Sequence, residues 1–204
     1  MRGMGIVLLL CAAGCSASVS PGDRTPVRVF LWGDSTLVFY FSSLEASAGG
    51  SAEFWFPEWH YGMTVESLRD RISGEERASL GAYDVFHLNT GLHDSFAEPP
   101  VTPAEYEAAW LDVLRVIREE NPWAPVVLAT SVVPDAGAHD ASLVREYNEV
   151  IRRIAFDLDG VRLDDLAAVQ EEEGLELEDG LHLTPEGSDR LGVAVWEAIE
   201  DALR

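Results

Sequence analysis

Cysteine is scarce in this sequence, and its position matters as much as its number. The chain has 204 residues but only two cysteines, Cys11 and Cys15, both close to the amino terminus. Everything after residue 15 lacks a thiol. That part of the chain can therefore form neither a disulfide bond nor a thiolate metal site.

Positive charge is scarce as well. The sequence has 36 Asp and Glu residues against 14 Lys and Arg, which gives a formal net charge of −22. Such a surface repels the phosphates of nucleic acids and of anionic membranes. The composition therefore argues against a nucleic-acid partner.

Long apolar runs are missing from the amino terminus, where a short one is found instead. Ile6–Leu10 is too short to span a bilayer as a mature helix, and with Arg2 before it this run is typical of an export signal. The residues Ala12-Ala13-Gly14-Cys15 resemble the lipobox of bacterial lipoproteins, in which the cysteine is acylated.

This pattern predicts three parts of the chain. We expect a lipoprotein-type signal segment over residues 1–14, a tether rich in Ser, Pro and Gly over 15–25, and one folded domain over 26–204. The expected protein is exported and held at a membrane only through a lipid on Cys15. Ordinary cleavage and release is the alternative.

The folded part opens with a strand that leads to a serine. Val27–Trp32 is a short apolar run that predicts a buried strand, and Gly33 then allows a tight turn. Ser35 is thereby placed at the carboxyl end of the strand, where reactive groups gather in open α/β sheets. Ser35 is therefore a candidate nucleophile. The alternative is that Asp34 or Ser35 only caps a helix that begins near Thr36.

Strand and helix patterns alternate along the rest of the chain. Further strands are predicted within 54–62 and at 85–89, 126–130 and 160–163, and helices at 37–44, 65–72, 103–121, 141–158 and 185–203. Glu171-Glu172-Glu173 is interpreted as a solvated charge run. The alternation predicts an α/β fold with three layers: a flavodoxin-like parallel sheet of about five strands, with helices on both faces.

The densest aromatic stretch of the chain runs from Phe54 to Gly62. Its Pro57 and Gly62 indicate a loop that returns toward the sheet edge. Trp55 and Trp59 are candidates for substrate contact, with a place in the core as the alternative. Gly62 can bring its backbone N–H close to a ligand.

Polar residues also follow the predicted strand Val85–Asn89. After Gly91 come His93 and Asp94, and with His87 these are residue types that can bind a metal. Strand alternation separates His87 from His93, so we expect no metal site here. His87 is instead predicted to be a core histidine that hydrogen-bonds to the backbone.

A base for the serine is found near the carboxyl end of the chain. Asp179 and His182 are three residues apart, in the loop that enters the last predicted helix. A loop of this kind can hold the carboxylate against one imidazole nitrogen while the other nitrogen points outward, as the general base of a serine requires. The alternative is a loop aspartate beside a surface histidine.

Together these segments resemble the GDSL-type esterases and lipases, also called SGNH hydrolases. Gly33-Asp34-Ser35 is similar to the nucleophile block, Gly62 to the glycine of the second block, Gly91-Leu92-His93-Asp94 to the Gly-x-Asn-Asp block, and Asp179-x-x-His182 to the last. The resemblance implies that Ser35 is the nucleophile, His182 the base and Asp179 its partner. It also implies an oxyanion hole with the N–H groups of Ser35 and Gly62.

His93 departs from the family pattern, in which an asparagine usually donates to the oxyanion. A neutral imidazole can still donate one N–H, so we expect His93 to complete the oxyanion hole. The segment Asp84-Val85-Phe86-His87-Leu88-Asn89 before it is similar to a subgroup of bacterial SGNH proteins with Gly-x-His-Asp.

The resemblance implies a serine esterase that needs no cofactor and no metal. We expect its substrate to be a small molecule or a glycan that carries a short acyl ester, acetyl especially. One rival is an O-acyltransferase with the same three residues. The other rival is a non-catalytic glycan-binding lipoprotein on the same fold.

Overall fold

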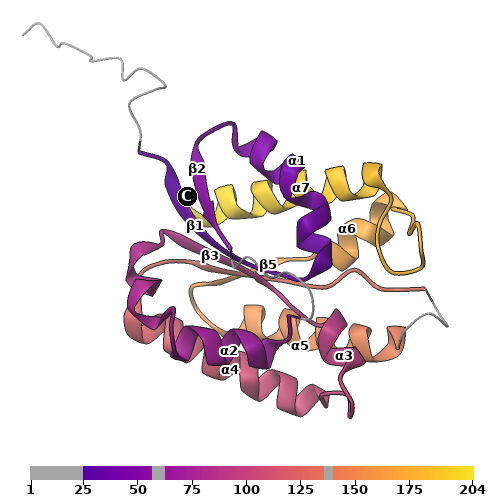
Figure 1. Ribbon diagram of the computed structural model, residues 1–204, viewed down its shortest axis with the longest axis horizontal. Coiled ribbons are helices and arrows are strands. Elements are labelled where there is room, and N and C mark those ends of the chain that lie inside the picture. The colour runs from indigo at the N-terminus through magenta and orange to yellow at the C-terminus, as the bar shows by residue number, and fades with distance from the viewer. Residues whose placement is uncertain (1–24, 57–62, 136–139) are drawn as a thin grey trace, which may run out of the picture.

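A parallel five-stranded sheet forms the centre of the molecule (Figure 1). The computed structural model describes residues 25–56, 63–135 and 140–204. The strands are β1 (Val27–Trp32), β2 (Ala52–Trp55), β3 (Val85–Asn89), β4 (Val126–Ala129) and β5 (Val161–Asp164), in the order β2-β1-β3-β4-β5. This order is that of flavodoxin-like sheets, so the predicted fold class is confirmed.

Helices cover both faces of the sheet, which gives three layers (Figure 1). One face carries α1 (Ser35–Ala48), α6 (Leu166–Glu173) and α7 (Pro185–Ala202). The other carries α2 (Val65–Ser73), α4 (Pro103–Glu120) and α5 (Ala141–Asp157), with a 3-10 segment η1 (Arg77–Ala82). The short α3 (Leu92–Phe96) follows β3, and its Leu92 belongs to the core beneath α1 and α7. No helix in the described ranges is long and apolar enough to cross a membrane.

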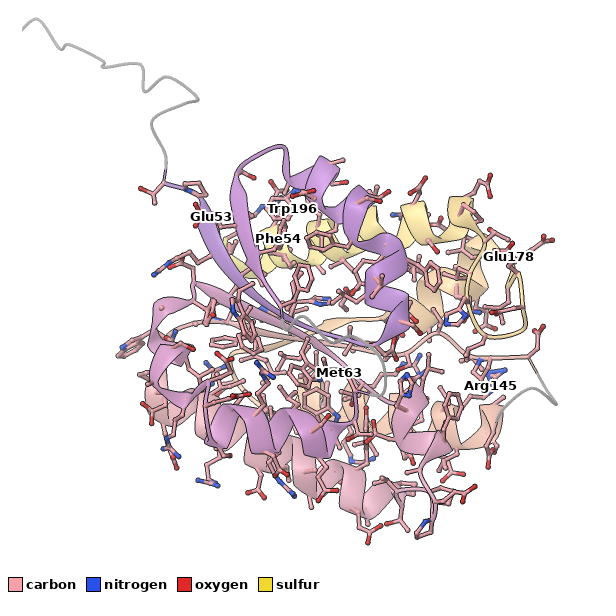
Figure 2. All side chains as sticks on the ribbon, in the orientation of Figure 1. Glu53, Phe54, Met63, Arg145, Glu178 and Trp196 are labelled. Carbon is pink, nitrogen blue, oxygen red and sulfur yellow. The ribbon has the colours of Figure 1, made fainter. Side chains whose placement is uncertain are left out.

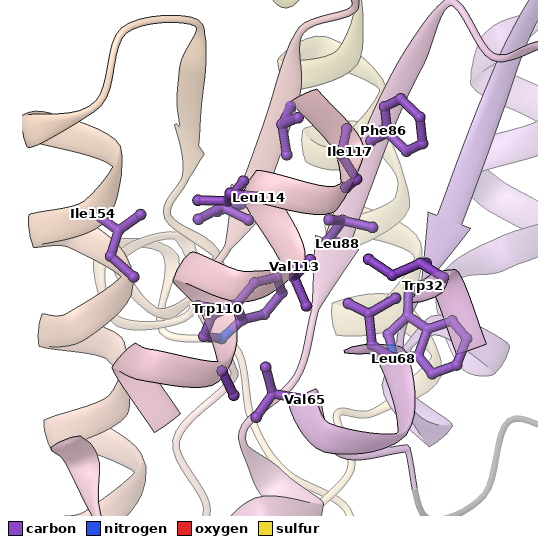
Figure 3. Packing of buried hydrophobic residues seen from close by; sticks show 14 of the residues in the cluster. Trp32, Val65, Leu68, Phe86, Leu88, Trp110, Val113, Leu114, Ile117 and Ile154 are labelled. Atoms are coloured by element: carbon purple, nitrogen blue, oxygen red, sulfur yellow. The ribbon is translucent and has the colours of Figure 1, made fainter. Parts of the chain in front are cut away.

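The strands are buried on both faces of the sheet. Successive side chains of a strand point to opposite faces, and each face has its own apolar core. Phe30 and Trp32 of β1 pack toward α2 and α4, whereas Val29 and Leu31 pack toward α1 and α7. Figure 3 shows the first of these cores, whose buried side chains include Trp32, Leu68 and Trp110. On the opposite face, Phe54 of the edge strand β2 and Trp196 of α7 meet edge to face (Figure 2).

Helices α1 and α7 approach each other unusually closely at Gly192. A Cβ atom at this position would lie 2.6 Å from the carbonyl oxygen of Tyr40 and 2.7 Å from the amide nitrogen of Leu44. Glycine is therefore required for the two backbones to touch. In addition, the hydroxyl of Ser43 donates a hydrogen bond to the carboxylate of Asp189.

Threonine side chains cap the starts of two helices on the other face, α2 and α4. The hydroxyls of Thr64 and Thr102 accept from the N–H groups of Ser67 and Glu105, and both turns form complete capping boxes. Asp34 is the N-cap of α1, so the cap that the alternative interpretation expected is present, at Asp34 and not at Ser35.

Three short helical segments were missed by the sequence analysis. They are α3, η1 and α6, each of eight residues or fewer. The Glu171-Glu172-Glu173 run is exposed, as predicted, but forms the last turn of α6. Segments this short carry too few apolar positions for a helical period to be recognised.

Candidate active site

Ser35 lies where β1 gives way to α1. It is the first residue of α1, and Asp34 caps the helix by accepting the N–H of Thr36 at Oδ1 (2.9 Å). The backbone N–H of Ser35 has no partner among the described residues, as is usual in the first turn of a helix. It is thus free to donate to an anion at the sheet edge.

Gly33 serves this turn in a different way from the one predicted. Its φ angle is not positive, so a special backbone conformation is not the reason for glycine. Instead, a Cβ at Gly33 would lie 2.7 Å from Cβ of Leu37. Glycine is needed here because the first turn of α1 packs directly on the residue that precedes Asp34.

Asp179 and His182 lie together in the loop before α7. The same loop carries Glu178, which is labelled in Figure 2. Gly180, with a φ of 81°, lets the loop turn back on itself. One carboxylate oxygen of Asp179 accepts the backbone N–H groups of Leu181 (2.9 Å) and His182 (2.7 Å). The other oxygen lies 2.8 Å from Nδ1 of His182.

These contacts set the charge of Asp179. The imidazole of His182 and the two backbone N–H donors hold the pKa of this carboxyl far below its usual range. The carboxylate therefore stays ionised and fixes the tautomer in which Nδ1 of His182 carries the proton. In that tautomer Nε2 is left to accept a proton.

Nε2 of His182 lies 2.8 Å from Oγ of Ser35. The structure thus brings Ser35, His182 and Asp179 together in one hydrogen-bonded chain, although Ser35 and His182 are 147 residues apart in the sequence. Such a chain can carry a proton from a serine hydroxyl to an imidazole whose positive charge is balanced by a carboxylate.

His93 is the second residue of α3. Gly91 starts this short helix with a φ of 139°, a conformation that favours glycine. The imidazole of His93 is half-buried and meets the ring of Phe96 edge to face, with the ring centroids 5.7 Å apart.

Asp34 links the two histidines electrostatically. Its carboxyl is fully buried, and burial raises its pKa, but the nearby His93 and His182 both act in the opposite direction. Both imidazoles are therefore close enough to act on the same carboxyl group. The structure places His93 at the same edge of the sheet as the Ser35–His182 pair.

Asp94 is a buried residue whose part in this edge of the sheet was missed. Its carboxyl has no exposed surface and accepts the N–H of Val65, the first residue of α2, at 3.1 Å. It thereby ties the start of α2 to the residue that follows His93. Burial raises the pKa of Asp94 to about 7. The sequence analysis named Asp94 as a possible metal ligand and as the end of the Gly91–Asp94 block, but not as a partner of α2.

His87 is buried, as predicted, but its predicted backbone partner is wrong. Nε2 lies 2.8 Å from Oδ2 of Asp164 at the end of β5, which is also buried. The backbone groups of β3 are used in the ladders with β1 and β4, so the imidazole pairs with a side chain two strands away. Within the described part of the chain, no group of three or more His, Cys, Asp or Glu residues is arranged to hold a metal ion.

The remaining predicted residues divide into two groups. Gly62, Trp59 and Cys15 lie outside the described residues. Trp55 lies at the end of β2, where its ring stacks on Phe30 with the centroids 4.6 Å apart. Trp55 also contacts Tyr83, and the guanidinium of Arg71 lies over its ring. These neighbours give Trp55 the core position that was the alternative to substrate contact.

Residues 31–190 of the sequence match the GDSL-like Lipase/Acylhydrolase family. The chain belongs to this family. The hydrolase accordingly acts on carboxylic esters, and the segments with Ser35, His93 and His182 all fall within the matched range. A search of curated proteins finds no match.

Solved structures share the fold of the hydrolase at low sequence identity. The acetyl xylan esterase AlAXEase has 18% identity and a TM-score of 0.69, over 85% of this chain and 100% of its own. A variant of Axe2, an acetylxylan esterase from Geobacillus stearothermophilus, has 17% identity and a TM-score of 0.68, over 85% and 94%. The catalytic domain of peptidoglycan O-acetyltransferase A from Streptococcus pneumoniae has 15% identity and a TM-score of 0.68, over 87% of this chain and 94% of its own.

Phe39 is a second residue at the site of the hydrolase that the sequence analysis missed. It lies on α1, and its ring centroid is 4.9 Å from that of the His182 imidazole. Half of its surface, 51%, is exposed. In the sequence it is one apolar residue among many in a predicted helix, so no pattern marks it.

The raised pKa of Asp94 makes the stability of the hydrolase depend on pH. Between its ordinary value of 3.8 and about 7, the folded protein holds this proton more tightly than the unfolded chain, so the free energy of unfolding falls as pH rises. We expect Asp94→Asn to remove this contribution. Relative to the wild type, its free energy of unfolding should rise by up to about 4 kcal/mol between pH 4 and pH 8.

Urea denaturation of both proteins at several pH values measures this difference. Asp112→Asn removes an exposed carboxylate and serves as the control for the loss of one charge. If the difference in the free energy of unfolding between Asp94→Asn and the wild type is constant across this pH range, Asp94 does not titrate as described.

Proposed function

We propose that the hydrolase is a serine esterase in which Ser35 is the nucleophile, His182 the general base and Asp179 its orienting partner. The observation that carries this proposal is the pair of hydrogen bonds, each 2.8 Å long, that joins the three side chains. His182 takes the proton of Ser35 as Oγ attacks the ester carbonyl. The acyl group is then bound to Ser35, and the alcohol leaves with the proton from His182. Water releases the acid in a second step that repeats the proton transfers.

The oxyanion of each step requires donors, and the N–H of Ser35 is one of them in this proposal. His93 and the N–H of Gly62 are proposed as the others. The place of His93 near Asp34, at the same sheet edge as Ser35, supports its share of this role. Donors fixed before the reaction stabilise the developing charge without having to reorganise.

For the substrate, we propose short acyl esters of carbohydrates, acetyl esters above all. Two of the similar structures are acetyl xylan esterases and a third is a peptidoglycan O-acetyltransferase, which supports an acetyl group on a sugar hydroxyl. Whether water or a second sugar hydroxyl accepts the acetyl group separates an esterase from a transferase. The free acetate formed from an acetylated glycan measures this directly.

Ser35→Ala tests the nucleophile. With p-nitrophenyl acetate, we expect the substitution to lower kcat by roughly 10³-fold or more, because no other group can form the acyl-enzyme. Ser42→Ala changes an exposed serine of the same helix and should leave kcat unchanged. Hydrolysis that survives Ser35→Ala at the wild-type rate would assign the reaction to another residue.

His93→Ala tests the oxyanion donor. We expect a loss of roughly 10²–10³ in kcat if the imidazole donates to the oxyanion. His93→Asn should retain most of the activity, since an amide also supplies an N–H donor. A decrease of less than about threefold in His93→Ala would remove this residue from the mechanism.

We also propose that the protein is exported and anchored through a lipid on Cys15. The lipobox-like residues Ala12-Ala13-Gly14-Cys15 and the apolar run before them support this proposal. Expressed in a bacterium, the wild type should partition into the detergent phase of Triton X-114, and Cys15→Ser into the aqueous phase. Equal partitioning of the two proteins would contradict the anchor.

A further inference from the structure

Phe39 borders the hydrogen bond between Ser35 and His182. It is the fourth residue after Ser35, so the two side chains lie on the same face of α1. Side chains of a helix lean toward its amino terminus, which directs the ring of Phe39 over the turn that carries Ser35. The contact of this ring with the imidazole of His182, at 4.9 Å between centroids, agrees with that direction.

The ring of Phe39 contributes little to the core. Leu37, Tyr40 and Leu44 of the same helix are buried to 2% exposure or less and pack toward α7, whereas Phe39 is 51% exposed. The exposed part of the ring is a flat apolar surface directly beside the proposed general base. Such a surface, next to a few polar groups of fixed position, is what small-molecule sites commonly contain.

The chemistry of the proposed reaction assigns this surface to one end of the substrate. His182 receives the proton of Ser35 and then gives it to the oxygen of the departing alcohol, so the alcohol must lie on the His182 side of Ser35. The oxyanion donors act on the carbonyl oxygen instead. A ring in contact with His182 therefore lies along the alcohol and not along the acyl group.

We infer that Phe39 forms the subsite for the alcohol part of the ester and selects alcohols that present a flat apolar face, such as the C–H face of a sugar ring. This inference rests on the proposed serine esterase and specifies which part of its substrate the structure recognises. An aromatic alcohol offers a similar face to Phe39, whereas a short alkyl alcohol does not.

Three acetate esters with different alcohols test this subsite: an acetylated xylo-oligosaccharide, p-nitrophenyl acetate and ethyl acetate. We compare wild type, Phe39→Ala and Phe39→Leu, since leucine keeps an apolar side chain but lacks the flat ring. Val38→Ala changes the neighbouring exposed apolar residue of α1 and is the matched control. For each ester, kcat and KM are measured separately and as a function of pH.

Loss of the ring should raise KM for the sugar and aryl esters by roughly three- to tenfold in both Phe39 variants, with kcat nearly unchanged. Values for ethyl acetate should stay within about twofold of the wild type, and Val38→Ala should change none of them. An equal loss on all three esters, with an altered pH profile, would make Phe39 only a positioning residue for His182 and overturn the inference. Unchanged KM values on all three would overturn it too.

The failure of the inference can be told from the failure of the proposed function. If hydrolysis by the wild type depends on Ser35 but is insensitive to Phe39, only the alcohol subsite is wrong. If Ser35→Ala hydrolyses these esters as fast as the wild type, the serine esterase is wrong and the subsite falls with it.

Discussion

The hydrogen bond between Ser35 and His182 depends on the close packing of α7 against α1. Ser35 is the first residue of α1, and His182 comes three residues before α7 begins. The distance between the two side chains is therefore set by how the two helices pack. Gly192 lets their backbones touch, where any Cβ would lie within 2.8 Å of three atoms of α1. A contact in the middle of two helices thus fixes the geometry at their ends.

The three aspartates near the candidate site differ in burial, and with it in the direction of their pKa shifts. Asp34 and Asp94 are fully buried, and burial raises the pKa of both. Asp179 is more than half exposed, and the His182 imidazole with two backbone N–H groups lowers its pKa. Only the exposed carboxylate is held ionised beside the imidazole, so it alone is suited to balance the charge of a protonated His182. Asp34 and Asp94 instead hold the starts of α1 and α2 in place through backbone N–H groups.

The sequence was sufficient for the sheet, the long helices and the grouping of Ser35, Asp179 and His182. The sheet and the helices depend on local signals, such as a run of apolar residues before a glycine. A carboxylate three residues before a histidine likewise marked the candidate base. In a parallel sheet the carboxyl ends of the strands meet at one edge. Local signals placed Ser35 at this edge, but its contact with His182, 147 residues away, was expected from the resemblance to the SGNH hydrolases.

The contacts that the sequence did not predict join a side chain to a partner far away in the sequence, and no nearby residue pattern marks that partner. The partner of His87 is Asp164, two strands away, and the partner of Asp94 is a backbone N–H of α2. Neither pairing can be derived before the strand order and the helix positions are known. Phe39 could not be recognised as a site residue for a similar reason. An apolar residue in a predicted helix does not show whether its side chain is buried or stays exposed. Only the position of the His182 loop, fixed by α7, turns an ordinary exposed phenylalanine into one wall of the site.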